Sequence, residues 1–430
     1  MSSANPPSFR QAINLPWNSF TPVKPGIKAE AEDTRAHNRS CEIPVIVGAG
    51  LAGCWLARTL AERGVRVCLI EQSNSVAAGA SGNPAGIAKP FVTRTPSMAM
   101  LFYALAHDYL LQQLSLLKLA EQTFIPCGVA QLVQRAYPPS TLYQCMNAMQ
   151  TDQRIGHNSR SEAIFFASSG WLKPDELCNL LARHPLIDLK LDHKLIDCRR
   201  NYKVNEPPGW TLNFEQHEQR DCQHLVLANG HSLSMLPETR ELPIVPARGQ
   251  LSRFELSLPG SAPSCIVNGK HYVIPDGNTV LVGASFQRNI DHSHILENDH
   301  EQNRLGISRL LPDLQINPIA LAGYAGVRAT TPDRLPLIGP IPDWLQCSEI
   351  YARLRHGDRA TQYAPLPLEK GLYVLGGFGS RGIVTAPLAA KLLADYLMGH
   401  NTLQEWSPLV NPARFRIREI KRGVSTVQTP

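Results

Sequence analysis

The sequence lacks the patterns that would point to a disulfide framework or a metal site. Its 10 cysteines are scattered, without a Cys-x-x-Cys pair and without a secretory signal. This distribution is typical of reduced thiols in a cytosolic protein. The 14 histidines show no metal-ligand spacing, and no Ser/His/Asp pattern for a nucleophile stands out. We therefore expect a cytoplasmic protein that uses no metal.

The chain also lacks a long hydrophobic run and has fewer acidic than basic residues. The longest apolar run starts at Pro44 and ends before Arg58, and it is too short and too rich in glycine to span a bilayer. We expect no membrane anchor. The chain has 36 acidic residues against 42 lysines and arginines, a net charge of +6. This balance suits an anionic partner such as RNA, but many enzymes share it, so charge alone does not decide the function.

The first 42 residues differ from the rest of the chain. They contain five prolines, have no acidic residue before Glu30 and show no sustained periodicity. We interpret residues 1–42 as a flexible N-terminal arm, with an organelle transit peptide as the alternative. The 430 residues as a whole are enough for two or three domains.

A βαβ unit follows the arm. Residues 43–47 are an apolar strand pattern, residues 51–63 have helical spacing, and residues 65–71 form a second apolar run. Further strands are predicted at 224–228, 271–274, 279–284 and 372–375, and helices at 97–119, 175–183, 300–311 and 386–397.

The turn between the first strand and its helix fits the dinucleotide-binding fingerprint. Gly48 allows a tight turn, Gly50 lets the backbone approach a pyrophosphate, and Gly53 lets the helix pack closely on the strand. Glu71 ends the second strand, where a carboxylate accepts ribose hydroxyls and repels a 2′-phosphate. The pattern favours FAD or NAD over NADP; a plain glycine turn is the alternative.

Two further loops favour FAD. Residues 78–86 form a second loop of small residues, against which a flat ring could lie. Residues 376–382 form another glycine-rich turn from a strand into a helix, whose N-terminal amides would stabilise charge on a reduced isoalloxazine. We therefore predict that segments more than 300 residues apart meet on one flavin.

These motifs resemble the family of FAD-dependent amine and amino-acid oxidases, which includes glycine oxidase, D-amino-acid oxidase and sarcosine oxidase. Within it, the likeness is greatest to the oxidase domain of MnmC, a bifunctional family that modifies the wobble uridine of tRNA. The segments that carry the likeness are 79–83, 283–285, 326–339, 379–382 with 386–387, and 411–414 with the basic stretch beyond.

The resemblance implies a fold and a division of the chain. The fold is α/β, with a Rossmann-like FAD-binding domain interleaved with a β-rich antiparallel substrate domain. We expect the FAD-binding domain at 43–95, 165–245 and 325–400, the substrate domain at 96–164 and 246–324, and a basic C-terminal tail at 401–430.

The resemblance also implies a reaction. It is the oxidative removal of the carboxymethyl group from 5-carboxymethylaminomethyl-(2-thio)uridine in tRNA, giving the 5-aminomethyl nucleoside and glyoxylate. With no room for a methyltransferase domain before Ile43, a separate methyltransferase is expected to act on the product. The alternatives are an oxidase of a small free amine, such as glycine, sarcosine or a D-amino acid, and a catalytically silent flavin-stabilised RNA-binding module.

Candidate site residues follow from the motifs and the resemblance. Arg328 is expected to hold a substrate carboxylate, Tyr272 to line the substrate pocket, and Arg381 to face the flavin or an RNA phosphate. We expect no general base, because hydride transfer from a neutral amine leaves an iminium. The predicted FAD contacts are Gly48, Gly50, Gly53, Glu71, Ala80, Ser81, Gly82, Asn83, Gly379, Ser380, Arg381 and Gly382.

RNA contact is predicted at the basic C-terminal stretch. At helical spacing Arg414, Arg418 and Arg422 share one face, which could bind phosphates; an amphipathic helix that buries Phe415 and Ile420 is the alternative. Leu281 stands where sarcosine oxidases place an oxygen-activating lysine. Lys89 and Lys270 are alternatives for that role, although both are interpreted more simply as solvated lysines.

Overall fold

The computed structural model describes residues 43–117, 119, 123–202, 208–358 and 363–423. The predicted N-terminal arm, residues 1–42, and the end of the predicted tail, residues 424–430, lie outside the described residues.

A mostly parallel sheet holds the strands of the predicted dinucleotide fold. Among the described residues six strands form it, in the order β20-β21-β13-β1-β2-β9, and only the β20–β21 pair is antiparallel. The strands are β1 (Val45–Val47), β2 (Val67–Ile70), β9 (Ile187–Lys190), β13 (Leu225–Leu227), β20 (Leu337–Pro342) and β21 (Leu368–Gly376). Pro44 precedes β1, so its missing N–H costs the ladder nothing.

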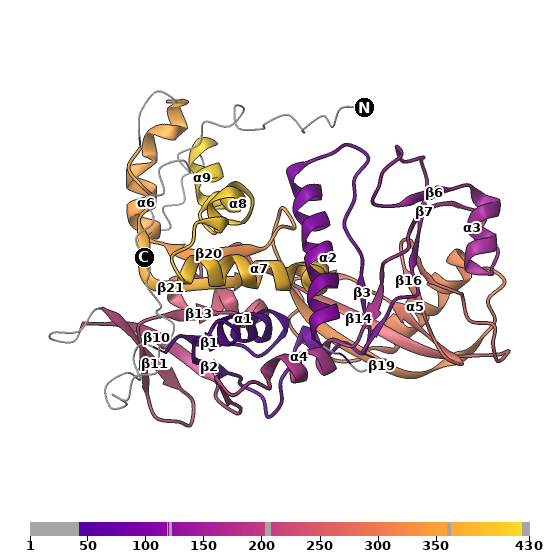
Figure 1. Ribbon diagram of the computed structural model, residues 1–430, viewed down its shortest axis with the longest axis horizontal. Helices are drawn as coiled ribbons and strands as arrows, with labels where there is room; N and C mark the ends of the chain where they lie inside the picture. Colours follow the sequence, from indigo (N-terminus) through magenta and orange to yellow (C-terminus); the bar gives the residue numbers. More distant parts are fainter. Residues whose placement is uncertain (1–42, 118, 120–122, 203–207, 359–362, 424–430) are drawn as a thin grey trace.

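Both faces of this sheet are covered, which explains its unbroken apolar strands. On one face Ile46 and Leu69 pack against helices α1 (Leu51–Ala61), α4 (Pro174–Ala182) and α7 (Gly382–Leu397). On the other, alternate strand residues pack against a small sheet of β10 (Leu195–Asn201), β11 (Gly209–Phe214) and β12 (Arg220–Cys222). Helix α2 (Met98–Leu116) packs on the same core as α1 and α7 and, in the view of Figure 1, runs between this region and the β14–β16 region.

A second, largely antiparallel sheet forms the other half of the protein. Its longest strands, β14 and β19, pair along most of their length, and β14 pairs along its other edge with β17 and β18. Its strands in the described chain are β5 (Val129–Val133), β6 (Gln144–Met146), β7 (Glu162–Phe166), β14 (Val245–Leu256), β15 (Ile266–Asn268), β16 (Tyr272–Asp276), β17 (Thr279–Gly283), β18 (Gln287–Arg288) and β19 (Ile316–Thr330). Helix α5 (Glu297–Leu310) covers one face, and α3 (Ala148–Ile155) packs on β7.

The remaining elements of the described chain are a small sheet, three helices and several 3₁₀ turns. Strands β3 (Gly86–Ala88), β4 (Phe124–Ile125) and β8 (Gly170–Leu172) form a small sheet. Helices α6 (Trp344–Ile350), α8 (Thr402–Val410) and α9 (Arg414–Lys421) follow β20 and α7. The 3₁₀ turns are η4 (Ala80–Gly82), η5 (Gly230–Met235), η6 (Pro237–Thr239), η7 (Ala352–His356) and η8 (Gly379–Arg381).

The structure confirms the predicted fold class of a Rossmann-like sheet combined with an antiparallel one. Every strand and helix predicted above is present, with ends that differ by up to four residues. The long pair β14–β19 was not assigned from the sequence as strands. No described helix combines the length and apolar character needed to cross a membrane. The division into domains stays a prediction.

Candidate active site

A large cavity opens at the carboxyl ends of the parallel strands. It has a volume of about 690 Å³, and its lining includes residues that directly follow β1, β2, β13 and β21. This edge is where open α/β sheets bind their ligands. The wall on the far side comes from β16 and β19 of the second sheet, so the cavity lies between the two sheets.

The loop after β1 requires its three glycines, because a Cβ on any of them would lie too close to a neighbouring atom. Gly48 has a φ of +104°, and a Cβ there would lie 2.6 Å from the Ala228 carbonyl oxygen. A Cβ on Gly53 would lie 1.9 Å from the Gly48 carbonyl oxygen, so the start of α1 fits only over a glycine. Gly50 faces Ser81, where a Cβ would lie 2.9 Å from the hydroxyl oxygen. The loop therefore leaves backbone, not side chains, facing the cavity.

Glu71 and Ser81 tie this loop to the rest of the cavity wall. Glu71 is 9% exposed, and its carboxylate accepts hydrogen bonds from the amides of Ala49 (2.8 Å) and Ser73 (3.1 Å). Ser81 accepts from the amide of Leu51 at 3.0 Å, which satisfies one of the free N–H groups at the start of α1. The carboxylate keeps lone pairs for further donors.

Two buried amide oxygens in the cavity wall have no partner among the described residues. They are Oδ1 of Asn83 and Oδ1 of Asn229, and both residues line the cavity. The orientation of Asn83 is set by its amide nitrogen, which donates to the Ala85 carbonyl at 2.7 Å. Because an unpaired buried acceptor costs about 1–3 kcal/mol, both oxygens are expected to accept from a bound group.

Arg328 and Tyr272 meet at the other end of the cavity, and each lies over a glycine. A Cβ on Gly249 of β14 would lie 2.1 Å from Nη1 of Arg328, and one on Gly283 of β17 would lie 2.6 Å from the Tyr272 hydroxyl oxygen. Burial lowers the pKa of Arg328 and raises that of Tyr272, and each group opposes the other's shift by its charge. The described chain shows no carboxylate paired with Arg328, so its guanidinium is available to a ligand.

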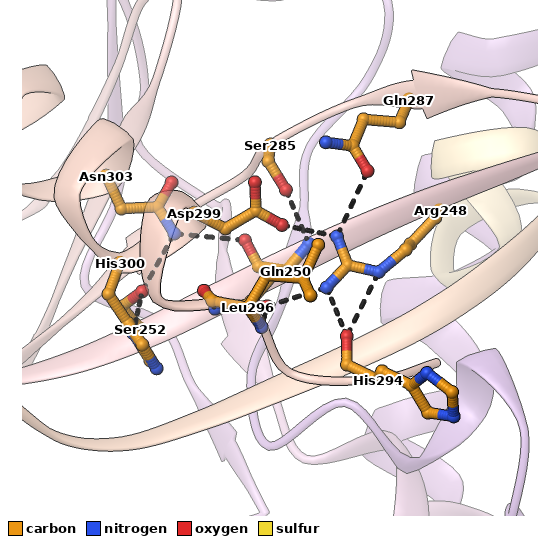
Figure 2. A network of polar contacts seen from close by, with 10 residues as sticks. All are labelled: Arg248, Gln250, Ser252, Ser285, Gln287, His294, Leu296, Asp299, His300 and Asn303. Carbon is orange, nitrogen blue, oxygen red and sulfur yellow. Dashed lines mark hydrogen bonds and ion pairs between the residues drawn. The ribbon is translucent and has the colours of Figure 1, made fainter. Parts of the chain in front are cut away.

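A buried polar network on the opposite face of β14 fixes the strand beneath Arg328. Successive strand residues point to opposite faces, so Arg248 and Gln250 flank Gly249 but point away from the cavity. Figure 2 shows the Arg248 guanidinium donating to Asp299, to the Gln250 side chain (2.7 Å) and to the His294 carbonyl (3.1 Å). Arg248 and Asp299 are both fully buried. The network therefore ties β14 to α5.

Arg381 is held in the cavity wall by two aromatic rings. Its guanidinium carbon lies 4.0 Å from the ring centre of Phe91 and 4.8 Å from that of Tyr103. Nη1 donates to the Tyr103 hydroxyl at 3.2 Å, and that hydroxyl donates to the Arg334 carbonyl at 2.6 Å. The structure therefore places Arg381 in the cavity lining. The sequence alone did not decide whether Arg381 faces the flavin or an RNA phosphate.

Lys89 also lines the cavity, whereas the other lysine considered from the sequence does not. Its Nζ donates to Gln131 Oε1 at 2.6 Å, and burial, with a contribution from the charge of Arg381, lowers its pKa to about 8. Lys270 is exposed, and Leu281 is a buried core residue. Lys89 is thus part of the site rather than the solvated lysine expected above.

The cavity brings together most of the residues predicted from the sequence. Of the predicted FAD contacts and the pair Arg328 and Tyr272, only Gly53 and Gly82 do not line it. Gly53 lies under the loop, and Gly82 packs against Tyr324, whose hydroxyl would lie 2.5 Å from a Cβ there.

The three predicted RNA-binding arginines lie outside the cavity lining, and two of them bind one carboxylate of the protein. Arg414 is 1% exposed and donates to both carboxylate oxygens of Asp333, at 3.0 and 2.9 Å. Arg418 donates to the same carboxylate at 2.7 Å, and Arg422 is exposed. The shared face thus exists, but it binds the turn after β19. Contact with RNA through these residues stays a prediction. The Arg414 guanidinium already binds the Asp333 carboxylate.

Sequence comparison places this site in a known family. Residues 45–396 match the family described as FAD dependent oxidoreductase. The chain belongs to that family. FAD is its cofactor, and the glycine loop, Glu71 and the two unpaired amide oxygens, which suit hydroxyl or N–H donors of FAD, are consistent with it. The described residues show no group of three or more acidic, histidine or cysteine side chains able to hold a metal.

Curated relatives of this FAD-dependent oxidoreductase carry a tRNA-modification name. The chain is 30% identical over 399 residues to "tRNA 5-methylaminomethyl-2-thiouridine biosynthesis bifunctional protein MnmC" of Aeromonas salmonicida, and 31% identical over 408 residues to that of Ectopseudomonas mendocina. These alignments cover 88% and 89% of this chain but 60% of each relative. The chain therefore spans about 60% of the length of these relatives.

Solved structures show the same fold. Glycine oxidase from Geobacillus kaustophilus has a TM-score of 0.66 at 20% identity, covering 85% of this chain and 97% of that one. L-proline dehydrogenase from P. horikoshii has a TM-score of 0.66 at 15% identity, covering 87% of this chain and 97% of that one. The fold of this oxidoreductase is thus similar to the folds of glycine oxidase and L-proline dehydrogenase.

Sequence reasoning missed Asn229, Gly249 and the aromatic pair around Arg381. Asn229 directly follows a predicted parallel strand, at the edge where ligands bind, and could have been found by that rule. Gly249 and the aromatic pair matter only through residues far away in the sequence, so no local signal marks them.

Proposed function

We propose that this oxidoreductase removes the carboxymethyl group from 5-carboxymethylaminomethyl-(2-thio)uridine at the wobble position of tRNA. The products are the 5-aminomethyl nucleoside and glyoxylate. The oxidised bond is the C–H bond of the methylene between the amine and the carboxylate. FAD, when bound, would supply the hydride acceptor for that bond, and water would hydrolyse the resulting iminium.

The observation that carries this proposal is the unpaired guanidinium of Arg328 in the FAD cavity. It lies over Gly249 beside Tyr272, and no described carboxylate pairs with it. A guanidinium binds a carboxylate with two parallel hydrogen bonds, which would fix the adjacent methylene. Tyr272 would close the pocket on the side of β16.

The cofactor contacts are part of the proposal. The loop at Gly48, Gly50 and Gly53 would bind the pyrophosphate of FAD, and Glu71 its adenosine ribose. Segments 80–83 and 379–382 would lie along the isoalloxazine and its ribityl chain. All except Gly53 and Gly82 face one cavity, although they come from segments more than 300 residues apart.

The choice of tRNA over a free amino acid is supported by the relatives at about 30% identity, which are named as tRNA-modification proteins. The Arg328 site alone fits any N-substituted glycine. A separate methyltransferase acting on the product, and a cytoplasmic location, belong to the same proposal.

Anaerobic flavin reduction tests the function directly. The FAD-loaded protein is mixed in separate syringes with tRNA that carries the carboxymethylaminomethyl group, with the same tRNA lacking the carboxymethyl group, with glycine and with sarcosine. We expect the flavin to be reduced fastest by the first tRNA, with release of one glyoxylate per flavin and formation of the aminomethyl nucleoside.

Each other outcome has a defined meaning. Faster reduction by glycine or sarcosine would contradict the tRNA assignment and support an oxidase of a free amine. Tight binding of the modified tRNA while the flavin stays oxidised would support a catalytically silent RNA-binding module.

A further inference from the structure

Lys89 lines the cavity, and the only role considered for it from the sequence is oxygen activation, not substrate oxidation. It follows β3 and shares the cavity with Tyr272 and Arg328. Its Nζ donates to Gln131 Oε1 at 2.6 Å and to the Pro90 carbonyl at 3.4 Å, and lies 5.3 Å from the ring centre of Phe166.

The contacts of Nζ leave one position open. An amine nitrogen has four tetrahedral positions, of which Cε takes one and the two oxygen acceptors take two. The fourth is an N–H bond when the amine is charged and a lone pair when it is neutral. None of the described carboxylates pairs with Lys89, in contrast to Lys173, Lys194 and Lys391, so its charged form has two neutral oxygen acceptors but no opposite charge.

Hydride transfer from a neutral amine needs no general base, as expected from the sequence, but a substrate that binds as its ammonium needs a proton acceptor before the hydride leaves. A secondary amine is mostly protonated at neutral pH, as a lysine side chain is. A hydride leaves the methylene only when the nitrogen lone pair is free to form the C=N bond. Arg328, which would hold the carboxylate, stays protonated and cannot take this proton.

We propose that Lys89 accepts the proton of the bound substrate ammonium. This inference rests on the proposed function, because it takes the substrate to be an N-substituted glycine. The N–H bond of the substrate breaks and a new N–H bond forms at Nζ, whose charge is then held by the Gln131 and Pro90 oxygens. With its nitrogen lone pair free, the substrate could form the C=N bond as its methylene gives up a hydride to the acceptor that FAD would supply, and Lys89 returns its proton to solvent before the next turnover.

The surroundings of Lys89 favour the neutral amine that can accept a proton. Arg381 from η8 acts on it electrostatically, burial and the charge of Lys89 lower the pKa of His107 from α2, and Tyr272 and Arg328 share its cavity. Burial, supported by Arg381, lowers the pKa of Lys89 to about 8, so a fraction of the lysine is neutral at pH 7. Glu71, the acidic residue in the described lining, lies at the end of β2 in the other sheet. With the guanidinium groups of Arg328 and Arg381 already in the cavity, a further charge on either the substrate amine or Lys89 is disfavoured.

The first test is the pH profile of anaerobic flavin reduction. Lys89→Met keeps the length of the side chain but cannot accept a proton, Lys89→Arg stays charged, and Lys270→Met is the matched control on an exposed lysine. We expect both Lys89 variants to slow reduction about 100-fold at pH 7 and to approach the wild-type rate as the pH rises and the substrate amine loses its proton in solution. A profile in both variants that superimposes on the wild type would overturn the proposal.

The second test needs no turnover, so it is readable even if the proposed substrate is wrong. Methoxyacetate has an ether oxygen in place of the amine, and its binding is followed by the visible spectrum of bound FAD. Its affinity for the wild type should fall as the pH rises past the pKa of Lys89, because a cation is lost from the pocket; in Lys89→Met the affinity should not change there. The same pH dependence in both proteins would refute an ionising Lys89 at the ligand. A variant that slows only reoxidation by oxygen, with both profiles intact, would also overturn the proposal.

Discussion

Gly249→Ala should act on catalysis through Arg328 without touching the substrate itself. The new methyl group would lie 2.1 Å from Nη1 and 2.8 Å from Cζ of Arg328, whereas ordinary contact begins at 3.4 Å. The network around Arg248 holds β14 on its other face, so the guanidinium, not the strand, has to move, by about 1.3 Å at its nearest atom. Misplacement of about 1 Å can cost 100-fold in rate, or about 2.7 kcal/mol of transition-state stabilisation.

A double-mutant cycle separates this effect from general damage. The rate constant for anaerobic flavin reduction divided by the substrate Kd is measured for wild type, Gly249→Ala, Arg328→Ala and the double variant, with FAD content and melting temperature as checks on folding. If Gly249 acts through Arg328, the double variant should match Arg328→Ala. Additive losses, or a change of less than twofold in Gly249→Ala, would refute the reasoning.

Three further predictions concern Arg328, Arg414 and Glu71. Arg328→Ala should weaken carboxylate binding about 100-fold without loss of FAD; unchanged turnover would remove its assigned role. Arg414→Ala should lower the free energy of unfolding in urea by about 3 kcal/mol, whereas Arg422→Ala should have almost no effect. Burial raises the pKa of the Asp333 carboxyl, but hydrogen bonds and charges from its arginine partners outweigh burial and leave that pKa below its usual value. The pair of Arg414 and Asp333 therefore stabilises the fold above about pH 4, and this contribution is lost as the pH falls through the lowered pKa. Arg414→Ala should flatten this dependence of stability on pH. Glu71→Ala should raise the Kd of FAD about 10-fold in a fluorescence titration; an unchanged Kd would contradict the assigned ribose contact.

The cofactor half of the site was largely predictable because its signals are local. The glycine spacing 48–53, the flanking apolar strands and Glu71 lie within 30 residues and need only short-range rules. The structure adds the reason for each residue: Gly53 packs on the Gly48 carbonyl, and Glu71 binds the amide of Ala49.

The C-terminal helix shows where local rules end. Helical spacing predicts that Arg414 and Arg418 share a face, and they do. Spacing does not tell whether that face meets solvent or the protein, because the partner, Asp333, is 81 residues from Arg414 along the chain.

The sequence by itself determined the fold class, the FAD loop and the family, because these follow from strand periodicity, glycine geometry and motifs that are contiguous in the chain. Only the tertiary structure decided how the substrate end is built. Gly249 and Gly283 make room for Arg328 and Tyr272, and Lys89 faces the same cavity. These relations join residues far apart in the sequence, and the pairing of β14 with β19 and the packing of the two sheets bring them together.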